Sequence, residues 1–221
     1  MTPLFAALVL SGAPQAADYI VIDIHTREVL AQHWEDASKP IPVGSLVKPF
    51  TALAHGFPFP AGFEKALAES SNPYFLNLAR ETRSESLRII AQKYSIPTPT
   101  TDSPETRIGL GKGWQIPPLA LLRAYAELSQ RSGEPAVAAI LHGLAEGARS
   151  GTSSAIGPGT LAKTGTASCI EKRHHAGDGF SLVLEPAESP RIALLVRIHN
   201  VPGKEAAKTA AQILHAVRSQ M

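Results

Sequence analysis

The stretch "VGSLVKPF", residues 43–50, places a serine and a lysine three positions apart, with a proline directly after the lysine. A helix that begins near Gly44 tolerates Pro49 in its first turn, where a missing N–H costs least. Ser45 and Lys48 then lie on one face, one turn apart. A helix start favours negative charge, and a lysine amine with a lowered pKa can take a hydroxyl proton. The stretch predicts a nucleophile beside its base, with a simple helix cap at Ser45 as the alternative.

A second polar motif, Ser70-Ser71-Asn72, interrupts two runs of helical apolar spacing in "FEKALAESSNPYFLNLA". One interpretation makes Asn72 the N-cap of a helix whose first residue is Pro73. In the functional interpretation, Ser70 and Asn72 project from an interhelical loop into a cleft. The Ser70 hydroxyl then relays a proton, and the Asn72 carboxamide holds a substrate amide. The residues alone leave both interpretations open.

A third motif, Lys163-Thr164-Gly165-Thr166, lies in "GTLAKTGTAS". It predicts a strand with an inward lysine and a glycine that lets another backbone approach closely. A lysine and two hydroxyls beside a bare backbone edge suit an extended substrate that ends in a carboxylate. The alternative is an edge strand protected by its lysine.

Outward from these motifs, the hydrophobic pattern changes twice along the chain. A hairpin is predicted over Tyr19–Ile24 and Glu28–His33, and helices from Ser45 to about Gly147. Strands return within residues 160–169, 179–186 and 191–199, and an amphipathic helix covers 203–220. This order predicts an α+β fold: an antiparallel sheet of about five strands, flanked by helices, with an inserted all-helical lobe.

We expect a single domain over residues 18–221. Residues 18–44 and 151–221 form its sheet lobe, and residues 45–150 form its helical lobe. A ligand cleft is expected where the helical lobe meets the edge of the sheet.

The N-terminal residues predict a signal peptide over 1–17. An apolar stretch from Pro3 to Leu10 is followed by small residues between Ala13 and Ala17, although basic residues before it are missing. The stretch is too short to span a bilayer, which needs about 20 apolar residues. The alternative is a buried first strand. We therefore expect an exported protein, at the periplasmic or extracellular face of the cell envelope, with no membrane span.

The remaining residues with chemical potential point to structure. Cys169 is the single cysteine, so no intrachain disulfide forms, and its spacing to His174–His175 matches no common zinc site. We expect a surface loop there. Trp114 and Tyr125 are predicted core residues, and Arg107 is a candidate for the flank of the cleft. A net charge of +2 without a basic run predicts no nucleic-acid partner.

Taken together and in this order, the three motifs resemble those of the penicillin-binding transpeptidase and serine β-lactamase superfamily, S-x-x-K, S-x-N and K-T-G. "ALAESSNPYF" resembles the second motif of peptidoglycan transpeptidases. "GLGKGWQIPPLALLRAYAELS" is similar to the family's G-x-G-x-x-x-x-P-L-x-x-x-x-A-Y-A segment. The resemblance runs from about Tyr19 to the C-terminus. The intervals between the motifs are shorter than in a full transpeptidase domain, so we expect a shortened form.

The resemblance implies a role for each motif residue, and it implies neither a cofactor nor a metal. Ser45 is implied as the acylated nucleophile, Lys48 as its general base and Ser70 as the proton shuttle. Asn72 is implied to bind the substrate amide, and the backbone N–H groups of Ser45 and Thr166 to form the oxyanion hole. Lys163, Thr164 and Thr166 are implied to hold the terminal carboxylate or to tune the field around Ser45, and Gly165 is implied as a further substrate-binding residue of the same strand.

The implied function is that of a penicillin-binding serine D,D-transpeptidase, which acts on peptidoglycan stem peptides through an acyl-enzyme on Ser45. Its implied partners are these stem peptides, β-lactam antibiotics and other cell-wall enzymes. Three alternatives remain open: a D,D-carboxypeptidase, a β-lactamase-like hydrolase, and a non-catalytic module that senses β-lactams or regulates a partner.

Overall fold

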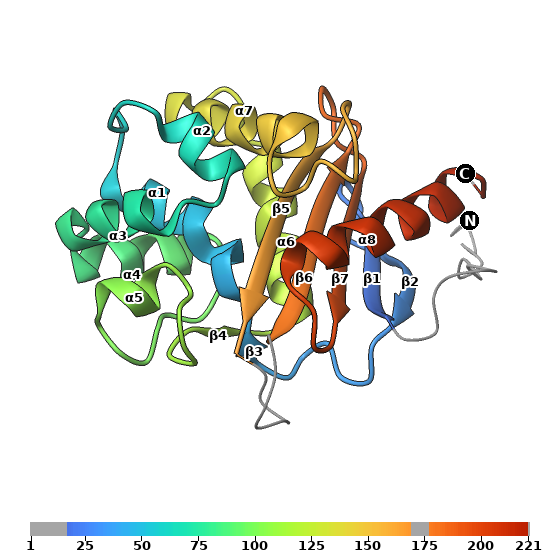
Figure 1. The fold of residues 1–221 in the computed structure, drawn as a ribbon, viewed down its shortest axis with the longest axis horizontal. Helices are drawn as coiled ribbons and strands as arrows, with labels where there is room; N and C mark the ends of the chain where they lie inside the picture. Colours follow the sequence, from blue (N-terminus) through green and yellow to red (C-terminus); the bar gives the residue numbers. More distant parts are fainter. Residues whose placement is uncertain (1–16, 169–176, 221) are drawn as a thin grey trace.

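The computed structural model describes residues 17–168 and 177–220, which contain a five-stranded antiparallel sheet with helices on both faces (Figure 1). The strand order is β2 (Val29–His33), β1 (Ala17–Asp23), β7 (Ile192–Ile198), β6 (Asp178–Glu185) and β5 (Leu161–Ala167). The N-terminal hairpin joins the C-terminal strands through the antiparallel pairing of β1 with β7. The α+β prediction is therefore confirmed, and each predicted strand is present within two residues of its expected bounds.

Alternating side chains supply the two faces of this sheet. In β1, Ile20 and Ile22 are buried on one face and Val21 on the other. The C-terminal helix α8 (Gly203–Arg218) packs against the Val21 face, and α6 (Pro118–Ser129) packs against the opposite face. Figure 1 shows α8 in front of the sheet and α6 behind it. The period-two pattern of the strands thus separates two apolar cores.

The helical insertion lies between β2 and β5 in sequence. It contains η1 (Gly44–Val47), α1 (Lys48–His55), α2 (Phe63–Ala68), α3 (Asn72–Glu81), α4 (Ser84–Lys93), α5 (Pro104–Arg107), α6 and α7 (Pro135–Ser150). It also contains a two-residue strand, β4 (Gln115–Ile116), which pairs with β3 (Ile41–Pro42). The hydrophobic pattern does not predict this pair, because two residues are too few to show a period.

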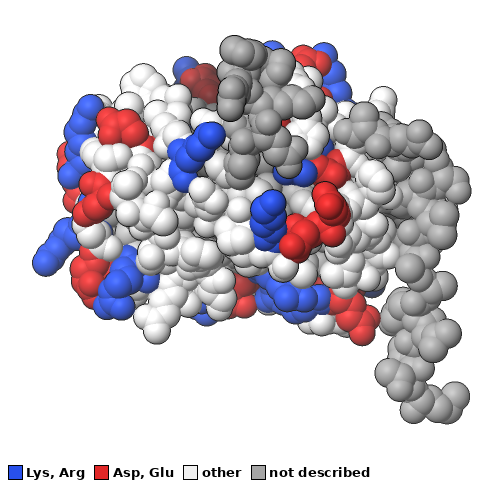
Figure 2. All heavy atoms as spheres, turned by 90° about the horizontal axis from the view of Figure 1, so that it is seen from below, with Lys and Arg blue, Asp and Glu red and all other residues white. Residues whose placement is uncertain are grey.

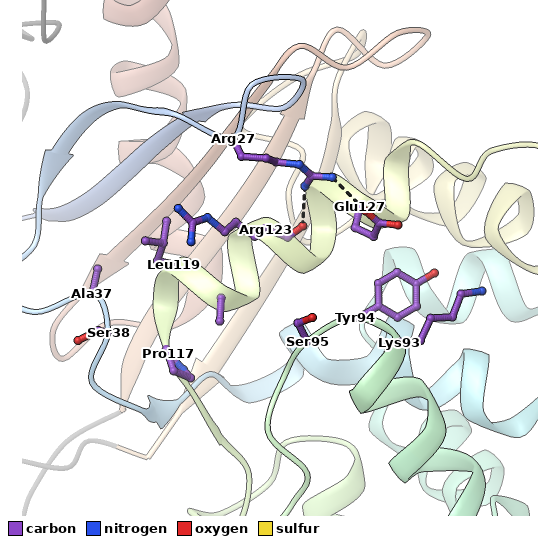
Figure 3. Close-up of a pocket in the computed structure, with 11 residues that line it drawn as sticks. Arg27, Ala37, Ser38, Lys93, Tyr94, Ser95, Pro117, Leu119, Arg123 and Glu127 are labelled. Atoms are coloured by element: carbon purple, nitrogen blue, oxygen red, sulfur yellow. Dashed lines mark hydrogen bonds and ion pairs between the residues drawn. The ribbon is translucent and has the colours of Figure 1, made fainter.

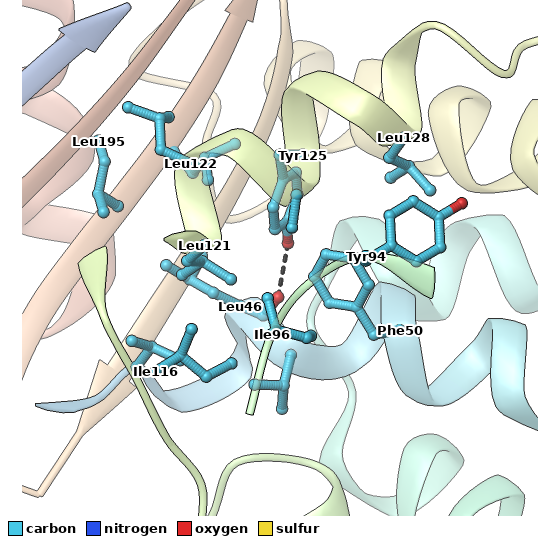
Figure 4. Packing of buried hydrophobic residues seen from close by; sticks show 14 of the residues in the cluster. Leu46, Phe50, Tyr94, Ile96, Ile116, Leu121, Leu122, Tyr125, Leu128 and Leu195 are labelled. Atoms are coloured by element: carbon cyan, nitrogen blue, oxygen red, sulfur yellow. Dashed lines mark hydrogen bonds between the residues drawn. The ribbon is translucent and has the colours of Figure 1, made fainter. Parts of the chain in front are cut away.

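Aromatic side chains fill the core between the insertion and the sheet (Figure 4). Phe50 packs edge-to-face against Tyr94 and Tyr125, at ring centroid distances of 5.3 and 5.4 Å. The Tyr125 hydroxyl donates to the Leu46 carbonyl oxygen at 2.7 Å, so α6 is hydrogen-bonded to η1. Trp114 is 2% exposed. The prediction that Trp114 and Tyr125 are core residues is therefore confirmed.

Arg107 is buried within the insertion. Its guanidinium donates to the carbonyl oxygens of Ala79 and Thr82, to the Ser84 hydroxyl and to the Asp102 carboxylate. These contacts join α5 to the end of α3 and the start of α4. The guanidinium therefore holds parts of the insertion together and does not lie on the flank of a cleft, for which Arg107 was a candidate.

Some of the predictions fall outside the described residues. Residues 1–16 of the predicted signal peptide are among these, and so are Cys169 and His174–His175. Ala17, the last residue of that predicted peptide, is the first residue of β1 and pairs with Ile198.

The charged side chains are mixed in sign on the face that Figure 2 shows, where Lys and Arg alternate with Asp and Glu. The full sequence has 21 basic and 19 acidic residues. Among residues 17–168 and 177–220, none of the helices combines the length and the apolar character that crossing a membrane requires.

Candidate active site

Ser45 lies where η1 meets the edge strand β5. Gly44 has a φ of +59°, and a side chain there would place its Cβ 2.4 Å from the Thr166 carbonyl oxygen. A Cβ on Gly165 would lie 2.7 Å from the Val43 carbonyl oxygen. Only glycine fits both positions, because backbone meets backbone at each. The half-buried Ser45 is thereby held beside the open edge of β5.

The start of the nucleophile segment agrees with the sequence prediction. Residues Gly44–Val47 form a 3-10 turn, and α1 follows directly with Pro49 in its first turn. Proline costs little there, since the first N–H groups of a helix have no intrahelical acceptor. Lys48 is the first residue of α1 and points into the protein, where it is fully buried.

The Lys48 amine contacts the loop between α2 and α3. Its Nζ donates to the Ser70 carbonyl oxygen and to Asn72 Oδ1, each at 2.7 Å, and lies 3.3 Å from Ser70 Oγ. The amine also lies 5.3 Å from the centre of the Phe75 ring. Burial lowers the pKa of Lys48 to about 7. A large fraction of this amine is therefore neutral near neutral pH.

The Lys163 amine reaches the same loop from β5. Its Nζ donates to Ser70 Oγ at 2.7 Å and to the Thr164 carbonyl oxygen at 2.8 Å. Burial lowers the pKa of Lys163 well below its ordinary value, and the positive charge of Lys48 lowers it further. Two amines from distant parts of the chain thus converge on one hydroxyl.

The loop that carries Ser70 has a strained backbone. Ser70 has a φ of +56°, in the left-handed region that non-glycine residues rarely adopt. Ser71 caps α3 by accepting from the Tyr74 N–H at 3.4 Å. The alternative that made Asn72 the N-cap is therefore wrong: Asn72 is the first residue of α3, and its side chain accepts from Lys48 instead.

The two threonine hydroxyls of β5 are held by protein groups. Thr164 Oγ1 donates to Thr152 Oγ1 at 2.6 Å, in the segment between α7 and β5. Thr166 Oγ1 accepts from the Gly203 N–H at 2.9 Å, at the start of α8. Neither Thr152 nor Gly203 is among the residues that the sequence predicts for the site. Hydrophobic spacing carries no signal for either, because each contact depends on how a distant loop returns to the strand.

Some of the predicted site residues are connected by hydrogen bonds, and others only by packing. Hydrogen bonds connect Lys48, Ser70, Asn72 and Lys163, and backbone packing places Gly165 against the segment before Ser45. The Ser45 hydroxyl has no hydrogen-bond partner among residues 17–168 and 177–220. The same described residues contain no cluster of three or more His, Cys, Asp or Glu side chains that could hold a metal ion.

This arrangement provides the elements of acyl transfer. Ser45 lies at the start of a helix, and the Lys48 amine follows one turn later. The Ser70 hydroxyl lies between two amines. Together such groups can move a proton from a nucleophile to a leaving group. β5 is an edge strand of the sheet, and its backbone packs directly against the segment that carries Ser45.

Comparison with solved structures identifies the fold. The transpeptidase domain of the FtsI4 D,D-transpeptidase from Legionella pneumophila is 20% identical, with a TM-score of 0.76 over 91% of this chain and 88% of that one. The apo transpeptidase domain of penicillin-binding protein 3 from Burkholderia pseudomallei is 16% identical, with a TM-score of 0.76 over 93% and 88%.

A third similar structure is the complex of penicillin-binding protein PBP2 with MreC from Helicobacter pylori. It is 14% identical, with a TM-score of 0.79 over 92% of this chain and 60% of that one. No protein-family model and no curated protein matches the sequence. The chain has the fold of the transpeptidase domains of penicillin-binding proteins, in a shortened form.

Proposed function

We propose that the protein is a penicillin-binding serine D,D-transpeptidase that acts on peptidoglycan stem peptides through an acyl-enzyme on Ser45. The observation that carries the proposal is the meeting of Lys48 and Lys163 at the Ser70 hydroxyl, at 3.3 and 2.7 Å. Buried amines are costly, and perturbed pKa values of this kind cluster at functional sites. A purely structural role would be served better by apolar side chains.

In the first step, the neutral Lys48 amine takes the hydroxyl proton of Ser45. The Ser45 oxygen attacks the carbonyl carbon of the penultimate D-alanine, and the carbonyl electrons move onto its oxygen. The N–H groups of Ser45 and Thr166 stabilise that oxyanion. Lys48 is suited to this task because its pKa of about 7 lies near the working pH.

In the second step, the oxyanion collapses and the C–N bond to the terminal D-alanine breaks. The proton held by Lys48 passes through the Ser70 hydroxyl to the departing amine, and D-alanine leaves. An acceptor amine of a second stem peptide then attacks the ester, which forms the cross-link and returns the proton to Ser45. With water as the acceptor, the same residues perform carboxypeptidase chemistry.

The substrate is held by the groups around Ser45. The Asn72 carboxamide binds the substrate amide, and β5 binds the extended donor along its open edge. Lys163, Thr164 and Thr166 hold the terminal carboxylate of the donor or tune the field around Ser45. A β-lactam opens on Ser45 in the same way, but its leaving amine stays attached, so the adduct persists.

The remaining parts of the proposal follow from this chemistry. Peptidoglycan stem peptides lie outside the cytoplasm, so the protein is exported, by means of the predicted signal peptide at residues 1–17. Other cell-wall enzymes are its expected partners.

A second candidate is a non-catalytic β-lactam-sensing or regulatory module. It is favoured by one observation, namely that the Lys48 amine contacts Ser70 and Asn72 while the Ser45 hydroxyl has no hydrogen-bond partner among the described residues. The two candidates differ in turnover. Only an enzyme releases D-alanine from a pentapeptide or forms cross-linked dimers.

The test is intact-protein mass spectrometry after penicillin treatment, with peptide mapping of the adduct, followed by an assay of D-alanine release. The proposal expects one adduct on Ser45, none in Ser45→Ala, and release of D-alanine by wild type alone. An adduct without turnover supports the sensing module. A protein that forms no adduct contradicts both.

A further inference from the structure

A pocket of about 610 Å³ opens on the outer side of α6, and none of the residues proposed to act in catalysis lines it (Figure 3). Three parts of the chain enclose it: α6 with the proline before it, the end of α4 with the two residues after it, and the segments on either side of β2. The lining residues are Arg27, Ala37, Ser38, Lys93, Tyr94, Ser95, Pro117, Leu119, Ala120, Arg123 and Glu127. Its volume lies within the range of about 300–1,000 Å³ that is typical of small-molecule sites.

The base of this outer pocket is apolar. Ala37, Pro117, Leu119 and Ala120 contribute aliphatic surface, and the Tyr94 ring adds an aromatic wall. Tyr94 is only 3% exposed, and it packs edge-to-face against Phe50. This wall is therefore fixed by the core behind it. A pocket with a rigid apolar wall binds an apolar body without first having to order its own side chains.

The rim of the outer pocket is cationic. Arg27, Lys93 and Arg123 contribute three positive charges, and Glu127 contributes the single negative one. Arg27 pairs with Glu127 at 3.1 Å, and Lys93 pairs with Glu134 at 3.2 Å. Two of the three cations thus have a carboxylate partner within the protein.

Arg123 is the exception. Its carbonyl oxygen accepts from Arg27 at 2.9 Å, but its guanidinium has no partner among residues 17–168 and 177–220. Figure 3 shows this side chain extending from α6 toward Leu119 and Ala37, over the apolar base. A guanidinium presents several N–H donors in a plane that matches a carboxylate, sulfonate or phosphate.

We propose that the outer pocket is a binding site for a small organic anion, with an apolar body on the α6 surface and one acidic head group at Arg123. Both parts of the ligand are needed. The apolar body supplies burial, and the head group pairs with the one rim cation that lacks a partner in the described protein. A neutral ligand leaves that cation unused, and an inorganic anion leaves the apolar base exposed. The site is separate from Ser45 and does not depend on the function proposed above.

The experiment is a fluorescence titration of the full chain with 8-anilino-1-naphthalenesulfonate, which has an aromatic body and one sulfonate. Wild type is expected to bind it with a single saturable phase. Arg123→Gln is expected to weaken binding by about tenfold or more, since charge-assisted hydrogen bonds to the sulfonate are lost. Ala120→Phe, which fills the base of the pocket, is expected to abolish the phase.

The matched control is Lys112→Gln. Lys112 is exposed, lies in a turn away from the outer pocket and loses the same single charge. It is expected to bind like wild type. Thermal melting of every variant shows that it is folded. Wild-type affinity in Arg123→Gln overturns the assignment of the head group, and wild-type affinity in Ala120→Phe overturns the pocket itself. If Lys112→Gln and Arg123→Gln weaken binding of the probe equally, the effect comes from the net charge of the protein alone, and the proposal is also overturned.

Discussion

Lys48 and Lys163 share one acceptor: the Ser70 hydroxyl lies 3.3 Å from the first amine and 2.7 Å from the second. The two lysines come from α1 and β5, and the positive charge of Lys48 contributes to the lowered pKa of Lys163. A second buried charge beside the first is costly, so the pair favours states with a single ammonium. Such a pair can hold one proton and pass it along the Ser70 hydroxyl.

The first prediction concerns pH. The pKa of Lys48 is about 7, and only its neutral amine can accept the Ser45 proton. The rate of acylation by penicillin should therefore rise with pH and level off above a midpoint near that value. Mass spectrometry of the adduct at timed intervals measures the rate. A rate that stays flat from acid to mildly basic pH contradicts the role of Lys48 as base.

The second prediction is a gain in stability for Lys48→Met. The pKa of Lys48 is about 7 in the folded protein, against an ordinary value of 10.5. Between these values the unfolded chain binds more protons, so the stability of wild type rises with pH. At a pH below both values, Lys48 is charged in the folded and in the unfolded protein, and the folded protein bears the full cost of the buried ammonium.

Lys48→Met should therefore melt above wild type at about pH 6, by roughly 2–4 °C for each kcal/mol gained, with a smaller gain at about pH 10. Thermal melts at both pH values measure the difference. The variant should also form no penicillin adduct. A variant that melts below wild type at acidic pH would show that the hydrogen bonds of Lys48 outweigh its burial.

The third prediction separates Ser70 from its neighbour. Ser70→Ala removes the acceptor shared by both lysines, so acylation should slow by about 100-fold or more. Ser71→Ala is the control, because Ser71 only caps α3. It should cost about 0.5–2 kcal/mol of stability and leave the rate unchanged. Equal rates in the two variants count against a proton path through Ser70.

The fourth prediction concerns the contact between β5 and the nucleophile segment. In Gly165→Ala, the new methyl would lie 2.7 Å from the Val43 carbonyl oxygen and 3.1 Å from Leu46 Cγ. The overpacking should cost about 1–3 kcal/mol and push Ser45 away from the strand, so acylation should be lost in a folded protein. Penicillin adduct formation and thermal melting are the two measurements.

The control for that variant is Gly133→Ala. A Cβ at Gly133 meets no atom within 4 Å, and this glycine is not among those with a positive φ. Its stability should stay within about 0.5 kcal/mol of wild type, or rise slightly, with normal acylation. If Gly165→Ala acylates at the wild-type rate, the close approach is not needed for the reaction.

Periodicity in the sequence was sufficient to predict the sheet and its two sequence-distant halves. The alternation around Ile20–Ile22 is unambiguous, because a one-residue shift would expose the whole apolar face. The start of α1 was equally predictable, since Pro49 restricts where a helix can begin. The β3–β4 pair was not predictable, because it follows from the positions of two loops that meet only in the folded chain.

The sequence predicted which residues belong to the site better than it predicted which hydrogen-bond partners their side chains take. Lys48, Ser70, Asn72 and Lys163 occur in the hydrogen-bonded network, and their catalytic roles stay predictions. Spacing could not decide between Ser71 and Asn72 as the cap, because both side chains suit that position. Nor could it assign the hydroxyls of the third motif, since a hydroxyl rotates to whichever partner the surrounding loops supply.

Backbone also packs on the other face of Gly165: a Cβ on Gly203 would lie 2.3 Å from the Gly165 carbonyl oxygen. Three main-chain segments therefore meet at this point: the Val43 carbonyl group, β5 and the start of α8. The distance between η1 and β5 is set by van der Waals contact between main-chain atoms. Substitution of neighbouring side chains therefore does not change this distance. Substitutions in the surrounding core can lower stability while the spacing at Ser45 stays constant.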